Sequence, residues 1–241
     1  MDIKNWTDDD IDSYLMNVID ETGGRVLISP LRVTYDKFIQ PKTPCMASVA
    51  KAHAFVVDCV DAYKNFLKYY RDCPFGETLA QQIQVVDNFI KDYFGFMGND
   101  EQRQRLNLQN PDLHSIRVYK GQNCAMCFER AILSHNLLKL LGLNSVLVTK
   151  NFHTYNIILN KNMAYLYDPT NPTIADIKGK TYRFPTIRII NSKNLPGYLF
   201  GNDIITINPG FYEFMFGATN VRVPKLQYPG LGLENKNINE R

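Results

Sequence analysis

The sequence lacks the features that would assign it at once to a membrane or secreted class. No run of about 18 consecutive apolar residues occurs in it, so we expect no transmembrane helix. Its first twenty residues are rich in aspartate and lack a basic segment followed by an apolar one, which argues against a secretory signal peptide. We therefore expect a cytoplasmic protein, and an effector secreted without a signal peptide would give the same pattern.

Clustered charge is also missing. The net charge is +3, and the 27 lysines and arginines are spread along the chain rather than gathered in one segment. This distribution offers no electrostatic footprint for nucleic acid or an anionic membrane, so we expect neither as a partner. With 45% hydrophobic and 21% charged residues, the chain has the composition of an ordinary globular protein.

Cysteine is scarce and unevenly placed. An odd total of five makes a disulfide framework a poor explanation and favours reduced thiols. Only Cys124 and Cys127 are close in sequence, and a zinc site would need a second pair of ligands. We therefore predict no metal and no cofactor.

Helical periodicity dominates the first part of the chain. Four segments space their apolar residues as an amphipathic helix does: 11–19, 49–70, 79–94 and 127–141. Thr7 is a suitable N-cap for the first segment, and Gly142 can end the last. Residues 99–121 are polar and predict a loop.

The second part of the chain is richer in β-branched and aromatic residues. It predicts strands at 145–150, 155–159, 163–167, 182–190 and 204–207. Helices followed by strands predict an α+β fold with an antiparallel sheet. We expect an N-terminal helical extension (1–75), a core (76–222) and a mobile C-terminal tail (223–241), because the tail has little to bury.

Of the two neighbouring cysteines, Cys127 is the better candidate nucleophile. If the buried helix ends at Gly142, its first turn falls near Cys127, where unpaired N–H groups and the helix dipole favour an anion. The thiolate is the reactive form of cysteine, and a helix N-terminus stabilises it. Cys124 lies one turn earlier, outside this field.

A thiol nucleophile needs a base, and four histidines are available. His53 and His135 fall within helical patterns and are expected to serve packing or to face solvent. His114 follows a Pro-Asp turn, and we expect it to be solvated. His153 differs from these three because it opens a strand.

The strand that follows His153 predicts a hairpin whose second strand ends at Asp168. If residues 160 and 161 form a two-residue turn, His153 and Asp168 lie directly opposite one another, with Cβ atoms roughly 5 Å apart. An unbulged loop of odd length would instead turn Asp168 to the other face of the sheet. The hypothesis of a His-Asp pair therefore requires a loop of even length or a compensating bulge.

These residues together resemble the transglutaminase-like superfamily. The resemblance covers about residues 121–170 and is carried by spacing: Cys127, Ala131, Leu141-Gly142, His153-Thr154-Tyr155-Asn156 and Asp168-Pro169-Thr170. It implies a papain/transglutaminase-like core, in which the nucleophile helix packs on an antiparallel sheet. It also implies a catalytic triad of Cys127, His153 and Asp168.

The chemistry implied is thiol-dependent acyl transfer through a thioester on Cys127. The family acts on peptide or protein amides, as cysteine peptidase, glutamine deamidase or transamidase, with water or an amine as acceptor. Gln122 and the backbone N–H of Cys127 are candidate oxyanion donors, and Tyr155 is a candidate substrate-binding residue. Two positions depart from the family pattern, because Ala125 replaces a glycine and Tyr155 replaces a tryptophan.

Other interpretations stay open. The segment NCAMCFE also resembles the nucleophile segment of papain-like proteases, whose histidine lies much farther downstream. Cys-Phe-Glu resembles arylamine N-acetyltransferases, which transfer acetyl groups from coenzyme A through a Cys-His-Asp triad. A third alternative is a non-catalytic protein-binding module on the same fold.

Overall fold

The computed structural model describes residues 1–20, 28, 34–46, 54–95, 99–150, 153–161, 163–177, 180–196 and 219–222. The strand predicted at 204–207 and the tail predicted at 223–241 lie outside the described residues, as does His53. Within the described part, no helix is long and apolar enough to span a membrane.

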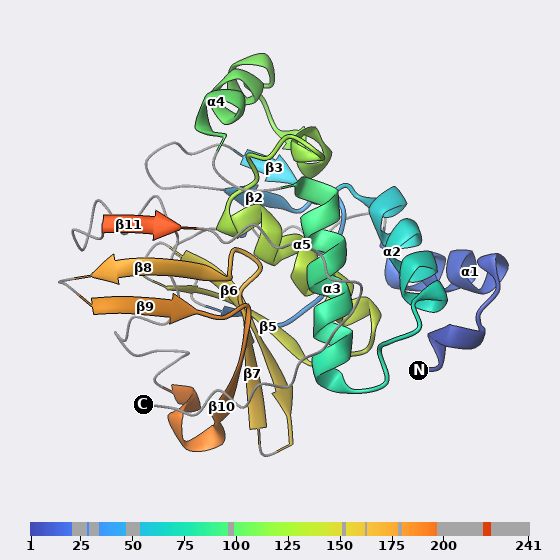
Figure 1. Cartoon of the computed structure of the whole chain (residues 1–241). Coiled ribbons are helices and arrows are strands. Elements are labelled where there is room, and N and C mark those ends of the chain that lie inside the picture. The colour runs from blue at the N-terminus through green and yellow to red at the C-terminus, as the bar shows by residue number, and fades with distance from the viewer. Residues whose placement is uncertain are drawn as a thin grey trace.

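Helices and strands both build the molecule, and the predicted α+β class is confirmed (Figure 1). The described residues contain five α-helices: α1 (Asp8–Val18), α2 (Val60–Asp72), α3 (Leu79–Phe94), α4 (Asp100–Gln109) and α5 (Cys127–Leu140). The main sheet is antiparallel throughout and has the order β1-β5-β6-β7-β10. Its strands are β1 (Thr34–Tyr35), β5 (Ser145–Lys150), β6 (His153–Asn160), β7 (Met163–Tyr167) and β10 (Ile187–Asn191).

Two smaller sheets flank the main one. The first has the order β11-β8-β9 and consists of β8 (Thr173–Ile177), β9 (Lys180–Phe184) and β11 (Thr219–Arg222). The second has the order β2-β3-β4 and consists of β2 (Pro44–Met46), β3 (Ala54–Val56) and β4 (His114–Ser115). Strands β3 and β4 pair in parallel, and the other pairs are antiparallel.

Helix α5 lies at the centre of the fold. It contacts α3 on one side and strands β5 and β6 on another, and every residue in it except Lys139 is buried. Its apolar side chains, such as Leu137 and Leu138, are fully inaccessible to solvent. Burial of each such leucine stabilises the fold by about 1.5–3 kcal/mol relative to exposure, so α5 is fixed firmly in place.

The first 75 residues share this core. Tyr63, Phe66 and Leu67 of α2 are fully buried in the same hydrophobic cluster as the leucines of α5. The hydroxyl of Tyr14 donates a hydrogen bond to the last residue of α5, at 2.9 Å from Leu140 O. The segment also provides β1, which pairs with β5, so it contains strands as well as the expected helices.

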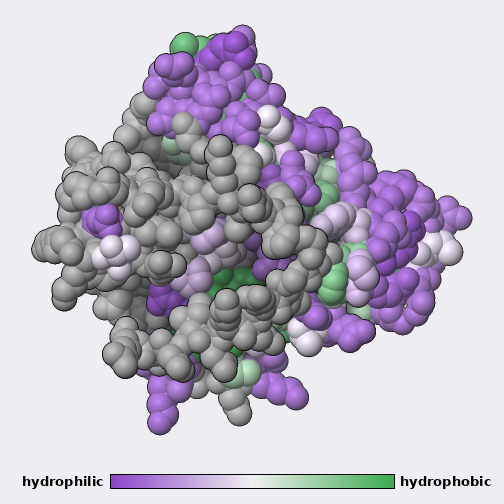
Figure 2. Space-filling model, in the orientation of Figure 1, coloured by the Kyte–Doolittle hydropathy of each residue, from purple (hydrophilic) through white to green (hydrophobic). Residues whose placement is uncertain are grey.

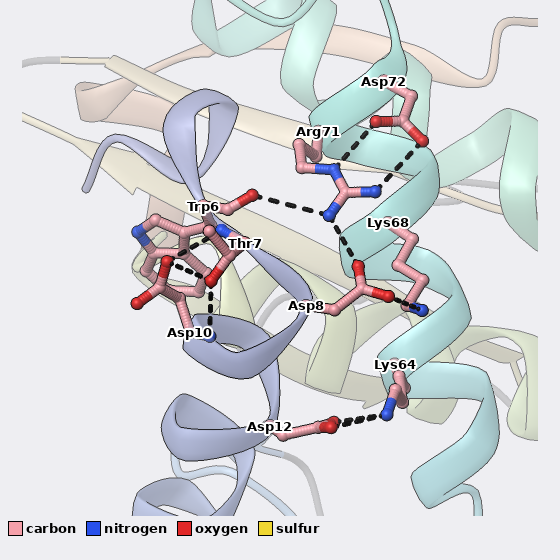
Figure 3. A network of polar contacts seen from close by, with 9 residues as sticks. All are labelled: Trp6, Thr7, Asp8, Asp10, Asp12, Lys64, Lys68, Arg71 and Asp72. Carbon is pink, nitrogen blue, oxygen red and sulfur yellow. Dashed lines mark hydrogen bonds and ion pairs between the residues drawn. The ribbon is translucent and has the colours of Figure 1, made fainter.

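Helix α1 is held against α2 by charged pairs on the surface (Figure 3). The carboxylate of Asp8 binds Arg71 at 2.7 Å and also Lys68, and Asp12 binds Lys64 at 2.6 Å. Exposed ion pairs contribute about 0.2–1 kcal/mol each, so they add little to the packing of α1 through its buried Ile11 and Leu15.

The helix ends agree well with the sequence where caps are present. Helix α1 is preceded by Thr7, whose side chain accepts a hydrogen bond from the backbone N–H of Asp10, as predicted. Helix α3 covers the predicted 79–94 segment and begins after Thr78. Helix α5 ends before Gly142, whose φ of 75° is one that glycine adopts without strain.

Three predictions of secondary structure are wrong. The helix predicted at 49–70 begins only at Val60, because residues 54–56 form strand β3 between β2 and β4. The loop predicted at 99–121 contains helix α4. The single strand predicted at 182–190 is two strands in different sheets, because the chain passes from β9 to β10 at Pro185 and Thr186.

Candidate active site

Cys127 is the first residue of α5. The helix begins after Met126, whose extended backbone ends the preceding loop and whose carbonyl accepts the first intrahelical bond, from Arg130 N at 3.1 Å. The N–H groups of a helix's first turn have no intrahelical acceptor, so they face whatever lies beyond the helix end. The Cys127 side chain is buried, with the residue only 7% exposed, at the positive end of the helix dipole.

His153 and Asp168 form a buried pair at the ends of neighbouring strands. His153 is the first residue of β6 and Asp168 directly follows β7. The His153 Nε2 atom lies 2.8 Å from Asp168 Oδ2, and the side chains are 6% and 0% exposed. This orientation leaves Nδ1 on the opposite edge of the ring, where it is buried and has no hydrogen-bond partner among the described residues.

The side chain of Cys127 interacts electrostatically with this imidazole. Burial alone would lower the pKa of His153, but the negative charge of Asp168 and the interaction with Cys127 raise it, and the pKa is about 10. The ring is therefore held in its protonated form at neutral pH, between two groups that can carry negative charge. The structure thus brings together all three residues of the predicted triad, from α5, β6 and the end of β7.

The hairpin between β6 and β7 has a different register from the predicted one. Asn160 is still in the strand and pairs with Met163, so the loop begins at Lys161 rather than at residue 160. The prediction that His153 and Asp168 are directly opposed is therefore wrong, because the position opposite Asp168 falls at Tyr155. The even loop length is confirmed, and it keeps the two side chains on one face, where they meet diagonally.

Asp168 is held by more donors than the sequence indicated. Its Oδ1 accepts hydrogen bonds from the backbone N–H of Thr170 at 3.0 Å and from the Thr170 hydroxyl at 2.6 Å. Its Oδ2 accepts from Asn171 Nδ2 at 3.1 Å in addition to His153. Thr170 and Asn171 were missed as positioning residues. An Asp followed two residues later by Thr is the pattern of a local side-chain turn, and that signal was available.

The ring of Tyr155 lies against the imidazole of His153. Its ring is stacked on His153, with centroids 6.2 Å apart and an angle of 25° between the planes. The residue is 1% exposed and packs with Val148, Ile157 and Leu166 in a small second hydrophobic cluster. The next residue, Asn156, points toward α5 and donates to Ala131 O at 3.1 Å, which ties β6 to the nucleophile helix.

The other candidate donor, Gln122, lies in the loop before α5. Its Oε1 accepts a hydrogen bond from Gln102 Nε2 at 2.6 Å, and its own Nε2 faces Lys120 O at 3.4 Å. Among the described residues, no hydrogen bond joins Gln122 to the Cys127, His153 and Asp168 group. The structure does not bring Gln122 together with the triad.

Cys124 is a buried packing residue. It belongs to the main hydrophobic cluster, and burial raises the pKa of its thiol, which disfavours the reactive anion. All five cysteines are free thiols. Within the described residues, no group of three or more His, Cys, Asp and Glu side chains could hold a metal ion.

Two further histidines have structural partners. His135 is fully buried in α5, between Ser145 Oγ at 3.0 Å and Lys37 O at 2.8 Å, in agreement with the packing role expected of it. The prediction that His114 is solvated is wrong. It is 9% exposed, and its Nε2 lies 3.2 Å from the hydroxyl of Tyr119.

Comparison with protein-family models, with curated proteins and with solved structures gives no match for this chain. The site is therefore interpreted from its own geometry.

Proposed function

We propose that this chain is a thiol-dependent acyl-transfer enzyme acting on amide bonds, with Cys127 as nucleophile, His153 as base and acid, and Asp168 as the group that orients the imidazole. The observation that carries the proposal is the buried 2.8 Å contact of His153 Nε2 with Asp168 Oδ2, which leaves Nδ1 to the thiol. Nucleophile, base and orienting carboxylate in series are the arrangement that activates a weak nucleophile.

The first half of the reaction forms a thioester. In the proposed resting state the Cys127 proton is already on His153 Nδ1, so the thiolate attacks the carbonyl carbon of the amide, a C–S bond forms and the carbonyl oxygen becomes an oxyanion. The backbone N–H of Cys127, in the first turn of the helix, donates to this oxyanion. The imidazolium then gives its proton to the amide nitrogen, the C–N bond breaks and the amine leaves.

The second half regenerates the Cys127 thiolate and the His153 imidazolium. Water or an amine loses a proton to His153 and attacks the thioester carbonyl, and the Cys127 thiolate leaves. With water the product is a carboxylic acid, and with an amine it is a new amide. The buried Asp168 remains an acceptor throughout and stabilises each imidazolium state.

The substrate class proposed is a peptide or protein amide, as in transglutaminase-like enzymes. Support comes from the arrangement of α5 against the antiparallel β5-β6-β7 sheet, with the thiol at the helix N-terminus and its partners at strand ends. We further propose that this unit is a transglutaminase-like core. The tie between Asn156 and α5 favours it, because it fixes the strand that carries His153 relative to the helix that carries Cys127.

The test is incubation with a cell extract and a labelled primary amine, followed by measurement of amine incorporation, ammonia release and peptide cleavage. We expect at least one of the three products from the wild-type protein. Cys127→Ala should abolish it while the circular dichroism spectrum is retained, and the matched variant Cys124→Ala should keep it. Equal turnover by Cys127→Ala would refute the proposal. An acetyl adduct on Cys127 after incubation with acetyl-coenzyme A would instead support the acetyltransferase alternative.

A further inference from the structure

Helix α4 contacts the loop before Cys127 at three consecutive residues. Each contact is a hydrogen bond from the first turn of α4 or its N-cap: Asn99 N to Asn123 O at 3.1 Å, Gln102 Nε2 to Gln122 Oε1 at 2.6 Å, and Arg103 NH1 to Cys124 O at 3.1 Å. Helix α4 therefore binds three consecutive residues of the loop that leads into the nucleophile, and the end of α3 binds the same loop through Tyr93 O and Phe94 O.

Arg103 links this loop to the nucleophile helix α5. Its other terminal nitrogen, NH2, lies 2.6 Å from Glu129 Oε1, and the second oxygen of Glu129 accepts the backbone N–H of Met126 at 2.9 Å. The guanidinium thus joins the carbonyl of Cys124 to the carboxylate that fixes Met126, the residue directly before the nucleophile. A planar guanidinium sets the direction of two acceptors at once, which a single point charge does not do.

A second buried guanidinium reinforces the same loop. Arg130 of α5 donates from Nε to Ala125 O at 2.9 Å and from NH2 to Gly95 O. Successive carbonyls, those of Cys124 and Ala125, therefore each bind an arginine. Because the peptide planes are rigid, fixing these carbonyls also fixes the path by which the backbone enters α5 at Cys127.

Besides Arg103, α4 packs Leu106 against the main hydrophobic cluster, and its Asn107 accepts a hydrogen bond from the Tyr119 hydroxyl at 3.0 Å. Arg103 is the one buried residue of the helix, Leu108 is 82% exposed, and hydrophilic residues cover most of α4 at the top of Figure 2. A buried ion pair adds little net stability compared with apolar packing, so stability alone does not account for Arg103 and Glu129. Both side chains bind residues 124–126, Arg103 at Cys124 O and Glu129 at Met126 N.

We propose that Arg103 is a positioning residue for the nucleophile: through Cys124 O and Glu129 it holds the N–H and the thiol of Cys127 in their reactive geometry. This inference rests on the proposed function for its consequence in turnover. Its first test does not, because the reactivity of the Cys127 thiol is measured directly.

The experiment measures the rate of iodoacetamide alkylation at Cys127 from pH 5 to pH 9, with tandem mass spectrometry to separate it from Cys124. The test variant is Arg103→Met combined with Glu129→Gln. It removes the clamp, by which we mean the contacts of Arg103 with Cys124 O and Glu129, without leaving a buried charge unpaired. The matched control is Arg105→Met, an exposed arginine on the same helix. We expect the double variant to lose roughly tenfold in alkylation rate near neutral pH, because misplacement of a reacting group costs this much or more. The control should match wild type across the pH profile.

Turnover supplies the second readout. With a substrate identified as above, the double variant should lower kcat with KM within about twofold, because the clamp acts on the nucleophile and not on substrate contacts. Arg103→Lys, which keeps the charge but not the two-pronged contact, should fall between wild type and the double variant in both measurements, and it replaces the double variant if that protein unfolds. Wild-type alkylation by a folded double variant, or by Arg103→Lys in its place, would overturn the inference even if turnover depends on Cys127. If the wild-type protein shows no turnover and the double variant still loses alkylation rate at Cys127, the positioning role is upheld and the proposed function is refuted.

Discussion

The two halves of helix α5 bury polar groups in different ways. In the second half, His135 and Asn136 are bound by neutral partners: Asn136 Oδ1 accepts from Ile39 N at 2.8 Å, and its Nδ2 donates to Ile39 O at 2.9 Å and to Tyr63 Oη at 2.7 Å. In the first half, Glu129 and Arg130 are buried charges. Neutral groups bind the second half of the helix to the fold, whereas charged groups bind the loop that leads into Cys127.

His135, in the second half of α5, and His153, which interacts with Cys127 in the first half, show the same contrast in charge. Burial lowers the pKa of His135 to about 4, so this ring is neutral and serves as a hydrogen-bonding spacer. Burial would do the same to His153, but Asp168 and Cys127 outweigh it and the pKa rises to about 10. Equal burial therefore gives opposite charge states, and the deciding factor is whether an anionic group lies in contact.

The largest effect is expected at Asp168, because this carboxylate keeps His153 charged. We expect Asp168→Asn to lower kcat by roughly a thousandfold, because the imidazolium loses its counter-charge and the ring its orientation. Without that charge the pKa of His153 should fall, so the alkaline limb of the rate profile should move to lower pH. Steady-state rates from pH 5 to pH 10 check both effects, with the exposed Asp61→Asn as control. An unchanged limb would mean that Asp168 does not set the charge of His153.

Substitutions in the second half of α5, where the buried polar groups are neutral, should lower the stability of the protein and leave its reaction rate nearly unchanged. Asn136→Ala leaves the N–H and C=O of Ile39 and the hydroxyl of Tyr63 without their partner, and should lower the free energy of unfolding by about 3 kcal/mol. Urea denaturation measures this loss, and Asn160→Ala, at an exposed position, is the matched control. Turnover of the folded protein should stay within a few-fold of wild type. A large loss of turnover in Asn136→Ala with no loss of stability would show that the second half of α5 also serves the reaction.

Lowering the pH should reduce the free energy of unfolding through His135, in the same half of α5. Its folded pKa of about 4 lies below the unfolded value, so between pH 6.5 and pH 4 the unfolded chain binds a proton that the folded protein does not. Its stabilising effect is complete above pH 6.5 and is lost as the pH falls, by about 2 kcal/mol or more near pH 4. Unfolding free energies of wild type and His135→Gln should converge as the pH is lowered through this window. Parallel curves would contradict a neutral His135.

The smallest effect is expected at the surface. Asp12→Asn removes the ion pair with Lys64, whose side chain is 38% exposed, and should change the free energy of unfolding by about 0.5 kcal/mol or less. Raising the salt concentration should reduce the difference further. Thermal unfolding at low and high salt measures it. A cost as large as that of Asn136→Ala would show that charge at α1 matters as much as buried polar contacts.

Helices with a regular apolar face could be predicted, whereas helix α4, which has the N-cap Asn99 but no apolar face, was not. The α3 segment has both, with Thr78 before it and a regular apolar repeat along it. Helix α4 has no apolar face, because it docks through Arg103, so periodicity gives no signal for it. The helix predicted from residue 49 failed for the opposite reason, since valines suit a strand as well as a helix and β3 occupies residues 54–56.

The candidate site was predictable in its residue types but not in its supports. Parity along β6 and β7 required an even loop, and the structure has one, but turn sequence did not reveal that Lys161 takes the left-handed conformation, with φ 46°, one residue beyond the expected start. The contact of Arg103 with Glu129 joins residues 26 positions apart on two helices. No spacing rule applies to such a pair, because its register is set by tertiary packing.

The position of Asp168 in the chain has a consequence for synthesis on the ribosome. Helix α5 finds its helical partners in residues already made, since α1, α2 and α3 all precede it. The imidazole and the carboxylate come later, at positions 153 and 168, and Thr170 and Asn171 later still. A nascent chain that has emerged only as far as α5 can therefore bury its leucines while its thiol lacks both partners, so unfinished polypeptides carry an unactivated sulfur.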